Sequence, residues 1–332
     1  MDSVAAVDVA VVIPNYNGER WLPGVLGSVA TQTLAPAEVL VVDDGSSDGS
    51  RALVAERFPA VRVLALGDNG GFARAANAGI RAVGTDAVAL VNSDVVLADD
   101  WLERAAAALD GAPGAASVAT KLVDMADPSL LYDAGDVLRR DGACEQRGRF
   151  QRDGGGYDEP GEVFSACAGA ALYRRDVVLA AGGFDERFGT YLEDVDLGLR
   201  LQLAGWSCRW EPRALARHAG AGSSGALPHG PSAWVERNTL LLVARAFPLR
   251  WLPLVAYRQL GWAWHAARAG RLREHLRGVG MALPLLPAFV RERRRLRAGA
   301  AVSVDEAIPA RPIRGPRAGG HPSRHARSRS CT

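Results

Sequence analysis

Short apolar runs alternate with amphipathic segments along the first hundred residues of the chain. Four runs rich in valine, leucine and alanine, at 9–13, 39–42, 61–66 and 87–91, have the length and composition of β-strands. Between them, residues 19–31, 48–58 and 71–83 have the length of helices. This alternation predicts an α/β fold in which right-handed β-α-β units build a mostly parallel sheet flanked by helices. In such sheets, ligands bind beyond the carboxyl ends of the strands.

The segments that follow the four predicted strands are polar and rich in acidic and amide residues. In order, they are PNYNG at 14–18, DDGSSD at 43–48, GDNGG at 67–71 and NSD at 92–94. The first strand is not followed by the G-x-G-x-x-G pattern of nicotinamide and flavin enzymes, and the sequence has no Walker-type glycine loop. Carboxylates at these positions suit a divalent cation and hydrogen bonds from a base or ribose. We therefore expect a magnesium-bridged nucleotide ligand at this edge of the sheet.

The second half of the chain predicts a further strand and a series of helices. Residues 164–173 form a strand-like run of small side chains. A helix is expected to begin near residue 192 and end at Gly205, because one apolar stripe contains Leu192, Val195, Leu199 and Leu203. From Ser232 onward, Trp, Leu and Arg recur at helical spacing at 234–247 and 252–269. We divide the chain into an α/β domain at 1–231, a basic amphipathic helical extension at 232–297 and a disordered Arg/Pro/Gly-rich tail at 298–332.

Charge is divided unevenly between these parts. Residues 1–231 contain 20 basic and 32 acidic side chains, whereas residues 232–332 contain 19 and 5, a net charge of +14. A basic helical arm suits an anionic membrane surface, and packing on the α/β domain is the alternative. Nucleic acid is a less favoured partner, because no aromatic residue is interleaved with the arginines beyond Phe289.

Cysteine spacing and hydropathy bear on the cellular compartment. The four cysteines are far apart and form no C-x-x-C pair, which disfavours a zinc ribbon or a secreted disulfide framework. The sequence shows no signal peptide and no uninterrupted apolar stretch of about 18–20 residues. We expect a cytoplasmic protein that can lie on the inner face of the cell membrane.

Five motifs, in this order, resemble those of family 2 glycosyltransferases with the GT-A fold, particularly the bacterial rhamnosyltransferase-like branch. They are VIPNYNG at 12–18, VDDGSSDGS at 42–50, NGGFARAAN at 69–77, NSD at 92–94 and EDVDL at 193–197. The resemblance spans about residues 9–224 and continues weakly to 296. It implies an inverting enzyme that moves a sugar from a nucleotide diphosphate to a hydroxyl of a glycan or polyprenyl-linked acceptor, in cell-envelope polysaccharide synthesis. The branch makes dTDP-rhamnose the first donor to expect, and UDP-hexoses the next.

The resemblance assigns one group of residues to the nucleotide-sugar. Asp43 receives the pyrimidine base, whose N3–H a carboxylate can accept, and Arg74 meets the diphosphate with its fixed fork of donors. The whole group is Pro14, Tyr16, Asn17, Asp43, Asp44, Arg74, Asn77 and Asn92. The alternatives are ordinary turns, helix caps and a solvated arginine.

The resemblance assigns the metal to Asp94 and His218. A carboxylate oxygen suits Mg²⁺ or Mn²⁺, and an imidazole is an acceptable ligand of manganese. The sequence departs from the family's Asp-x-Asp motif at Asn92, which weakens that position as a ligand. A helix cap for Asp94 and a solvated loop histidine are the alternatives.

The resemblance also assigns the catalytic base and the acceptor contacts. Asp194 takes the proton of the acceptor hydroxyl, with Glu193 beside it, and helix-dipole pairing is the alternative for both. Gly169 and Trp206 are candidate acceptor contacts, or else core residues. Asp196 is expected to pair with Arg200 four positions on.

Two other classes of function stay open. A nucleotidyltransferase also uses acidic strand ends and a metal, but it normally brings a glycine-rich activating loop with Arg and Lys near the first strand, and this sequence lacks one. A non-catalytic sugar-binding module would need neither Asp194 nor a cation.

Overall fold

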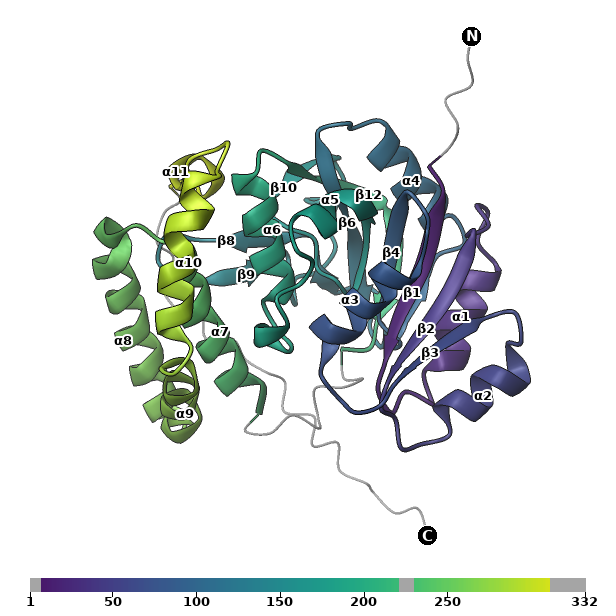
Figure 1. Ribbon diagram of the computed structural model, residues 1–332, viewed down its shortest axis with the longest axis horizontal. Helices are drawn as coiled ribbons and strands as arrows, with labels where there is room; N and C mark the ends of the chain where they lie inside the picture. The colour runs from purple at the N-terminus through teal and green to yellow at the C-terminus, as the bar shows by residue number, and fades with distance from the viewer. Residues whose placement is uncertain (1–6, 221–229, 311–332) are drawn as a thin grey trace.

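The structure, a computed structural model, describes residues 7–220 and 230–310 of the 332-residue chain. Its main sheet contains β1 (Val9–Asn15), β2 (Glu38–Asp44), β3 (Arg62–Leu66), β4 (Ala87–Val91), β5 (Val95–Leu97), β6 (Ala115–Asp124), β7 (Leu131–Asp133), β10 (Gly161–Val163), β11 (Ala170–Arg174) and β12 (Ser207–His218). The order is β10-β12-β6-β11-β4-β1-β2-β3, with β5 paired to β12 and β7 to β6 (Figure 1). β8 (Asp136–Leu138) and β9 (Cys144–Gln146) form a separate hairpin. The four N-terminal strands predicted from the sequence are confirmed.

Strand direction brings distant parts of the sequence to one edge of the sheet. β1 is parallel to β2 and β4, and β6 is parallel to β12. β11 runs antiparallel to both β4 and β6, so β12 points the same way as β1 and β4. The carboxyl ends of β1, β2, β4, β6 and β12 therefore share an edge with the amino end of β11.

Helices cover both faces of the sheet. α3 (Phe72–Ala82), α5 (Arg175–Ala180) and α6 (Glu193–Leu203) pack on one face, and α1 (Leu22–Ala30), α2 (Ser50–Arg57) and α4 (Trp101–Asp110) on the other (Figure 1). Along β1, Val12 belongs to the first apolar cluster, whereas Val11 and Ile13 belong to the second. Successive side chains of a strand point to opposite faces, so a strand covered on both sides is apolar at every position. This explains the continuous apolar runs in the sequence.

The predicted strand at 164–173 is shorter in the structure. β11 begins at Ala170, because the preceding residues form a loop whose backbone groups bond to other elements. The carbonyl of Ser165 accepts the amide of Asp136 at 3.1 Å, and the amide of Ala168 donates to Asp194 at 3.2 Å. This loop therefore connects the sheet edge to the start of α6.

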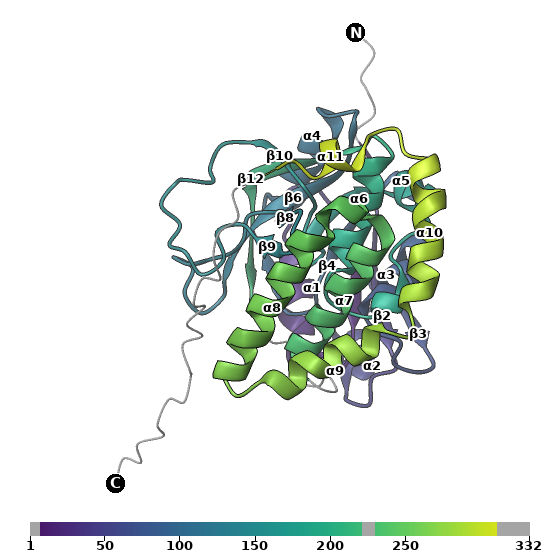
Figure 2. The same cartoon turned by 90° about the vertical axis from the view of Figure 1, so that its left-hand side faces the viewer.

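Four C-terminal helices pack together. They are α7 (Gly230–Ala246), α8 (Leu252–Arg268), α9 (Leu272–Ala282) and α10 (Leu286–Ala298), with a short 3₁₀ turn, η3 (Leu249–Trp251), before α8 (Figures 1 and 2). Two of them, α7 and α10, contact α6. Leu199 and Leu203 of α6 share a buried cluster with Leu241 and Phe289. None of the helices in the described ranges is long and apolar enough to cross a bilayer.

The prediction that the chain is disordered from residue 298 is wrong for its first part. Ser303 and Glu306 form a capping box that starts α11 (Val304–Ala307), and Ile308 is fully buried in the same apolar cluster as Phe289. Composition did not indicate this, because only a few apolar residues anchor the segment. The rest of the predicted tail, 311–332, lies outside the described residues.

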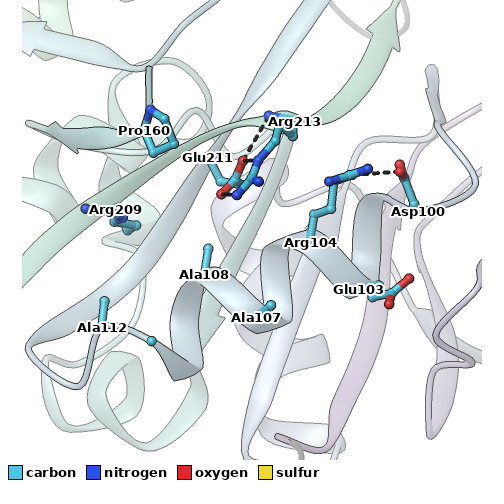
Figure 3. A pocket seen from close by; sticks show the side chains of 11 residues that line it. Asp100, Glu103, Arg104, Ala107, Ala108, Ala112, Pro160, Arg209, Glu211 and Arg213 are labelled. Carbon is cyan, nitrogen blue, oxygen red and sulfur yellow. Dashed lines mark hydrogen bonds and ion pairs between the residues drawn. The ribbon is translucent and has the colours of Figure 1, made fainter. Parts of the chain in front are cut away.

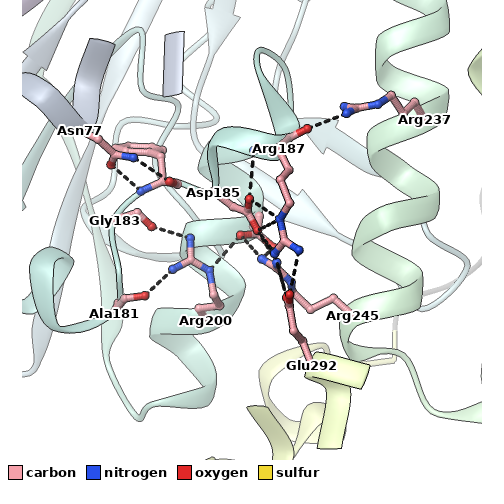
Figure 4. Close-up of polar contacts among 11 residues, drawn as sticks. Asn77, Ala181, Gly183, Asp185, Arg187, Arg200, Arg237, Arg245 and Glu292 are labelled. Atoms are coloured by element: carbon pink, nitrogen blue, oxygen red, sulfur yellow. Dashed lines mark hydrogen bonds and ion pairs between the residues drawn. The ribbon is translucent and has the colours of Figure 1, made fainter. Parts of the chain in front are cut away.

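An ion-pair network fastens the C-terminal helices to the α/β domain (Figure 4). Arg245 of α7 bonds both oxygens of Asp196, at 2.6 and 2.7 Å, and one oxygen of Glu292 in α10 at 2.8 Å. Arg200 bonds the same Asp196 at 2.8 Å, which confirms the predicted pair. Removing one partner of a buried pair typically costs about 3–5 kcal/mol, because the other charge is left buried. The extension is therefore part of the folded body and holds α6 in place.

Candidate active site

Asp94 and His218 meet at the carboxyl edge of the sheet. Asp94 follows β4 and His218 ends β12, and both are about 95% buried. Nε2 of His218 lies 3.1 Å from Oδ1 of Asp94, although 124 positions separate them in sequence. The amide of Ala219 also donates to the Asp94 carbonyl at 3.1 Å. The structure thus brings the two predicted metal ligands into direct contact.

The contact suits a divalent cation. Two ligands at right angles around an ion with bonds of about 2.1 Å lie about 3.0 Å apart, close to the separation of these two atoms. Nδ1 of His218 is buried and has no hydrogen-bond partner among residues 7–220 and 230–310. No group of three or more His, Cys, Asp or Glu side chains gathers as a metal site within the described residues. An ion here would complete its shell with substrate phosphates and water, which is usual for Mg²⁺.

Asp194 lies in the first turn of α6, close to the same edge. Its Oδ2 accepts the amide of Ala168 at 3.2 Å, and its Oδ1 accepts the amide of Val195 at 2.8 Å. The next residue, Gly169, has no side chain, and a Cβ there would lie 3.4 Å from Cε1 of His218. The loop 168–169 therefore separates the predicted base from the predicted metal ligands. Gly169 also accepts the amide of Asn92 at 2.8 Å.

The turn before α6 is strained. Tyr191 and Leu192 have φ angles of 68° and 64°, in the left-handed region that large side chains rarely adopt. Nδ2 of Asn238 in α7 donates to three carbonyls of this turn, those of Phe188, Thr190 and Tyr191, at 3.1, 3.0 and 2.6 Å. Strain of this kind clusters at active sites, where the surroundings impose it. Asn238 was not predicted from the sequence, because a single buried asparagine in a helix gives no local signal.

Buried carboxyl groups surround Asp194. Burial raises the pKa of Asp194, and burial together with the neighbouring Asp194 charge raises the pKa of Glu193, Asp133 and Asp136. Oγ of Ser165 donates to Asp136 at 3.1 Å, whereas Oε2 of Glu193 has no partner among the described residues. A raised pKa makes a carboxylate a stronger proton acceptor near neutral pH. Asp133 and Asp136 were not predicted; their signal was two acids within the otherwise apolar segment 130–138.

The loops after β1 and β2 are bonded to each other. Nδ2 of Asn15 donates to Asp43 at 3.2 Å, and the amide of Asn17 donates to Oγ of Ser46 at 2.9 Å. Oδ1 of Asn17 accepts the amide of Ser47 at 2.8 Å. Among the predicted nucleotide contacts, Tyr16 is partly exposed beside them, whereas Pro14 is buried within β1. These loops form a rigid polar rim at the same sheet edge.

Asp44 and Arg74 have local partners. The carboxylate of Asp44 accepts the amide of Gly71 at 2.7 Å and that of Gly70 at 3.0 Å, which holds the loop before α3. Burial raises the pKa of Asp44, and these two amides oppose the rise. Arg74 is paired with the exposed Asp68 at 3.0 Å. The interactions of Asp44 within the chain are thus those of a loop-positioning residue.

The structure does not bring Asn77 and Trp206 to this edge. The amide of Asn77 bonds both the N–H and the carbonyl of Phe184, each at 2.8 Å, and lines a hollow beside the Arg245 network (Figure 4). Trp206 precedes β12, whose opposite end carries His218, and it packs on the apolar cluster of the face that α6 covers, so the length of β12 separates it from the metal-ligand pair. Asn77 therefore lies away from the residues gathered at this edge, and the packing of Trp206 is that of the core residue given as its alternative.

A separate hollow of about 550 Å³ lies between α4 and β12 (Figure 3). Its charged side chains pair with each other, Arg104 with Asp100 at 2.6 Å and Arg213 with Glu211 at 2.8 Å. None of the predicted site residues lines it.

Comparisons with known proteins agree with the fold and the motifs. The sequence profile of Glycosyl transferase family 2 matches residues 10–180. An N-acetylglucosaminyl-diphospho-decaprenol L-rhamnosyltransferase of Mycobacterium tuberculosis is 32% identical over 270 residues, covering 73% of this chain and 87% of that protein. A pre-mycofactocin glycosyltransferase of the same organism is 34% identical over 64% of this chain and 42% of its own length.

Solved structures show the same architecture at lower identity. The mannosyltransferase PcManGT from Pyrobaculum calidifontis, in complex with GDP-Man and Mn²⁺, aligns with a TM-score of 0.53 and 20% identity, over 89% of this chain and 86% of its own. GalNAc-T7 with UDP, GalNAc and Mn²⁺ aligns with a TM-score of 0.58 and 14% identity, over 73% of this chain and 48% of its own. At these identities the similarity establishes the fold.

Proposed function

The chain belongs to glycosyl transferase family 2 and has a GT-A-like fold, and from this premise we propose that it is a metal-dependent, inverting rhamnosyltransferase acting on a lipid-linked acceptor. The observation that carries the proposal is the meeting of Asp94, His218 and the loop 168–169 that bonds Asp194, at one edge of the sheet. The name of the mycobacterial relative supports the sugar and the acceptor class. The proposed donor is dTDP-rhamnose, with UDP-hexoses as the second choice.

The proposed reaction is a single displacement. The acceptor oxygen bonds to the anomeric carbon as its proton passes to Asp194. The bond from that carbon to the donor phosphate breaks, and its electron pair leaves with the nucleoside diphosphate, so the configuration inverts. A divalent cation held by Asp94 and His218 would offset the charge that develops on the departing diphosphate.

The surroundings of Asp194 suit this role. Two backbone amides orient its carboxylate, and burial raises its pKa, so the group combines fixed geometry with basicity. The buried Glu193 lies beside it at the proposed acceptor side. Asp43, at the far side of the edge, accepts Asn15 and the amide of Ser46, and retains lone pairs for the N3–H of a pyrimidine.

We assign two roles to the extension at 232–297. α7 and α10 support α6, as described above. α8 and α9 instead expose apolar side chains, and Tyr257, Leu260 and Trp264 of α8 are 61–72% exposed. These three positions recur at i, i+3 and i+7, so they share one face of the helix. Exposed arginines follow them, namely Arg268, Arg271, Arg273 and Arg277. This apolar and basic surface fits an anionic membrane, which would bring the site to a polyprenyl-linked acceptor.

The experiment that tests the function is a panel of nucleotide-sugars incubated with the full chain, Mn²⁺ and a prenyl-diphosphate-GlcNAc acceptor. We expect release of nucleoside diphosphate and one added sugar of inverted configuration. Consumption of a nucleoside triphosphate would identify a nucleotidyltransferase instead. Saturable sugar binding with no turnover of any donor would identify a binding module.

A further inference from the structure

Arg149 and the exposed Phe150 lie in the loop after β9, and the ring of Tyr132 connects this loop to the metal-ligand pair. Cζ of Arg149 is 4.1 Å from the ring centroid of Tyr132, and the ring of His218 is 4.2 Å from the same centroid. Two groups this close to one centroid cannot share a face, so Tyr132 separates Arg149 from His218. Arg149 is thus one aromatic layer away from the proposed cation.

Arg149 carries a charge that no carboxylate of the described residues neutralises by direct contact. Within residues 7–220 and 230–310 it forms no ion pair at 4.0 Å or less, and its Nη1 donates to the neutral Oε1 of Gln146 at 2.5 Å. Nε2 of Gln146 lies 3.9 Å from Sγ of Cys167, next to the amide that bonds Asp194. This chain of contacts places Arg149 on the side of the base, across Tyr132 from the metal ligands.

Phe150 is held in an unusual conformation on the surface. Its φ is 61°, which is an outlier for a bulky side chain, and its side chain is 54% exposed. Two backbone bonds impose this geometry, from the amide of Phe150 to Leu131 at 2.9 Å and from the amide of Leu131 to Gln151 at 2.8 Å. Its ring also lies 4.8 Å from the Arg149 guanidinium. Other large exposed hydrophobic residues of the described chain lie at 249–290, so Phe150 is isolated from that surface.

We propose that Arg149 and Phe150 form the acceptor subsite, in which Arg149 binds the diphosphate of a lipid-linked sugar and Phe150 stacks on its ring. This proposal rests on the proposed function and names the part of the site that recognises the acceptor. A guanidinium presents paired donors to phosphate oxygens, and an aromatic ring covers the apolar face of a pyranose at small entropic cost. The donor diphosphate lies at the cation on the other side of Tyr132, so the two diphosphates occupy different places.

Direct binding tests this assignment without requiring turnover. The probes are GlcNAc-diphosphate on a short prenyl chain and the neutral prenyl glycoside of GlcNAc, each titrated into the full chain with Mn²⁺ and dTDP. We expect Arg149→Met to lower the affinity for the diphosphate probe roughly 10- to 100-fold and to leave the affinity for the neutral glycoside unchanged. Phe150→Gly should lower the affinity for both probes several-fold, and glycine adopts the positive φ of this position without strain. Arg152→Met, an exposed arginine of the same loop, is the matched control and should change neither.

Three results would overturn the proposal. The first is unchanged binding of the diphosphate probe by Arg149→Met. The second is loss of dTDP affinity in that variant with the acceptor probe unaffected, which would place Arg149 at the donor. The third is that the wild-type protein transfers sugar but binds both probes equally. In that case the proposed function holds, and the proposal that Arg149 recognises the acceptor diphosphate is wrong. If the wild type binds the diphosphate probe through Arg149 but turns over no nucleotide-sugar, the subsite holds and the proposed function fails.

Discussion

Asn238 connects the C-terminal helices to the catalytic base, and its removal should reduce turnover without affecting the donor site. In Asn238→Ala, the carbonyls of Phe188, Thr190 and Tyr191 lose their shared donor. The NH₂ group supplies two N–H bonds, each with a net value of about 1 kcal/mol, and a carbonyl left buried and unpaired adds about 1–3 kcal/mol. We therefore expect a loss of about 3–5 kcal/mol in stability.

That amount is comparable to the strain in the turn. Each residue held at a positive φ costs about 1–3 kcal/mol, and both Tyr191 and Leu192 are so held. Without Asn238 the turn can relax and move the start of α6, which carries Asp194. The expected result is a fall in kcat of at least about tenfold, with the Kd for dTDP unchanged, because β1 and β2 are remote from α7.

The assay is steady-state release of nucleoside diphosphate, paired with thermal unfolding and titration of dTDP with Mn²⁺. Thr239→Val is the control, since the Thr239 hydroxyl is buried without a partner among the described residues and valine has its shape. A variant Asn238→Ala with wild-type kcat would refute the argument that this side chain positions the base. If kcat falls equally in Asn238→Ala and Thr239→Val, the cause is the general packing of α7 and not the hydrogen bonds of Asn238.

Three further predictions concern pH, metal and membrane. Burial raises the pKa of Asp194 above its ordinary 3.8, and protonation of this carboxylate removes the base as pH falls. The acidic limb of the kcat–pH profile should therefore have its midpoint above pH 3.8, and a midpoint at or below pH 3.8 would contradict this. The same shift means that the folded state gains stability as pH falls through the raised pKa, since the buried group prefers to be neutral. Asp94→Asn should lower transfer by about a thousandfold and remove thermal stabilisation by Mn²⁺, and full activity in excess EDTA would reject the metal assignment. Leu260→Glu with Trp264→Glu should weaken sedimentation with anionic vesicles by at least about tenfold and leave soluble-acceptor turnover intact, whereas unchanged sedimentation would reject the membrane surface.

The sheet was predictable because its strands are covered on both faces. A strand such as β4 is apolar at all five positions, Ala87–Val91, and this pattern needs no knowledge of distant contacts. The meeting of Asp94 with His218 follows from strand direction once the order β12-β6-β11-β4 is known. The family resemblance assigned Asp94 through the NSD motif and His218 through its place downstream of the acidic helix, but their 3.1 Å contact depends on a register that spans 124 positions.

The parts that sequence reasoning missed depend on long-range packing. Asn238 acts on a turn 47–50 positions away, and Arg149 stacks on Tyr132 from a separate loop. Asn77 was assigned by its motif, yet its amide completes the backbone bonds of Phe184. In each case the partner is a backbone group or a ring brought close by the fold, and no periodicity in the sequence marks it.

In the proposed mechanism, a base, a cation and a donor diphosphate gather at one edge of the sheet. The most direct test is Asp194→Asn, measured both for Mn²⁺-dependent binding of the donor that the wild type turns over and for single-turnover transfer to the acceptor. We expect donor affinity within about twofold of wild type and transfer slowed by about 100- to 10,000-fold, the usual contribution of a general base. Transfer at the wild-type rate would contradict this mechanism.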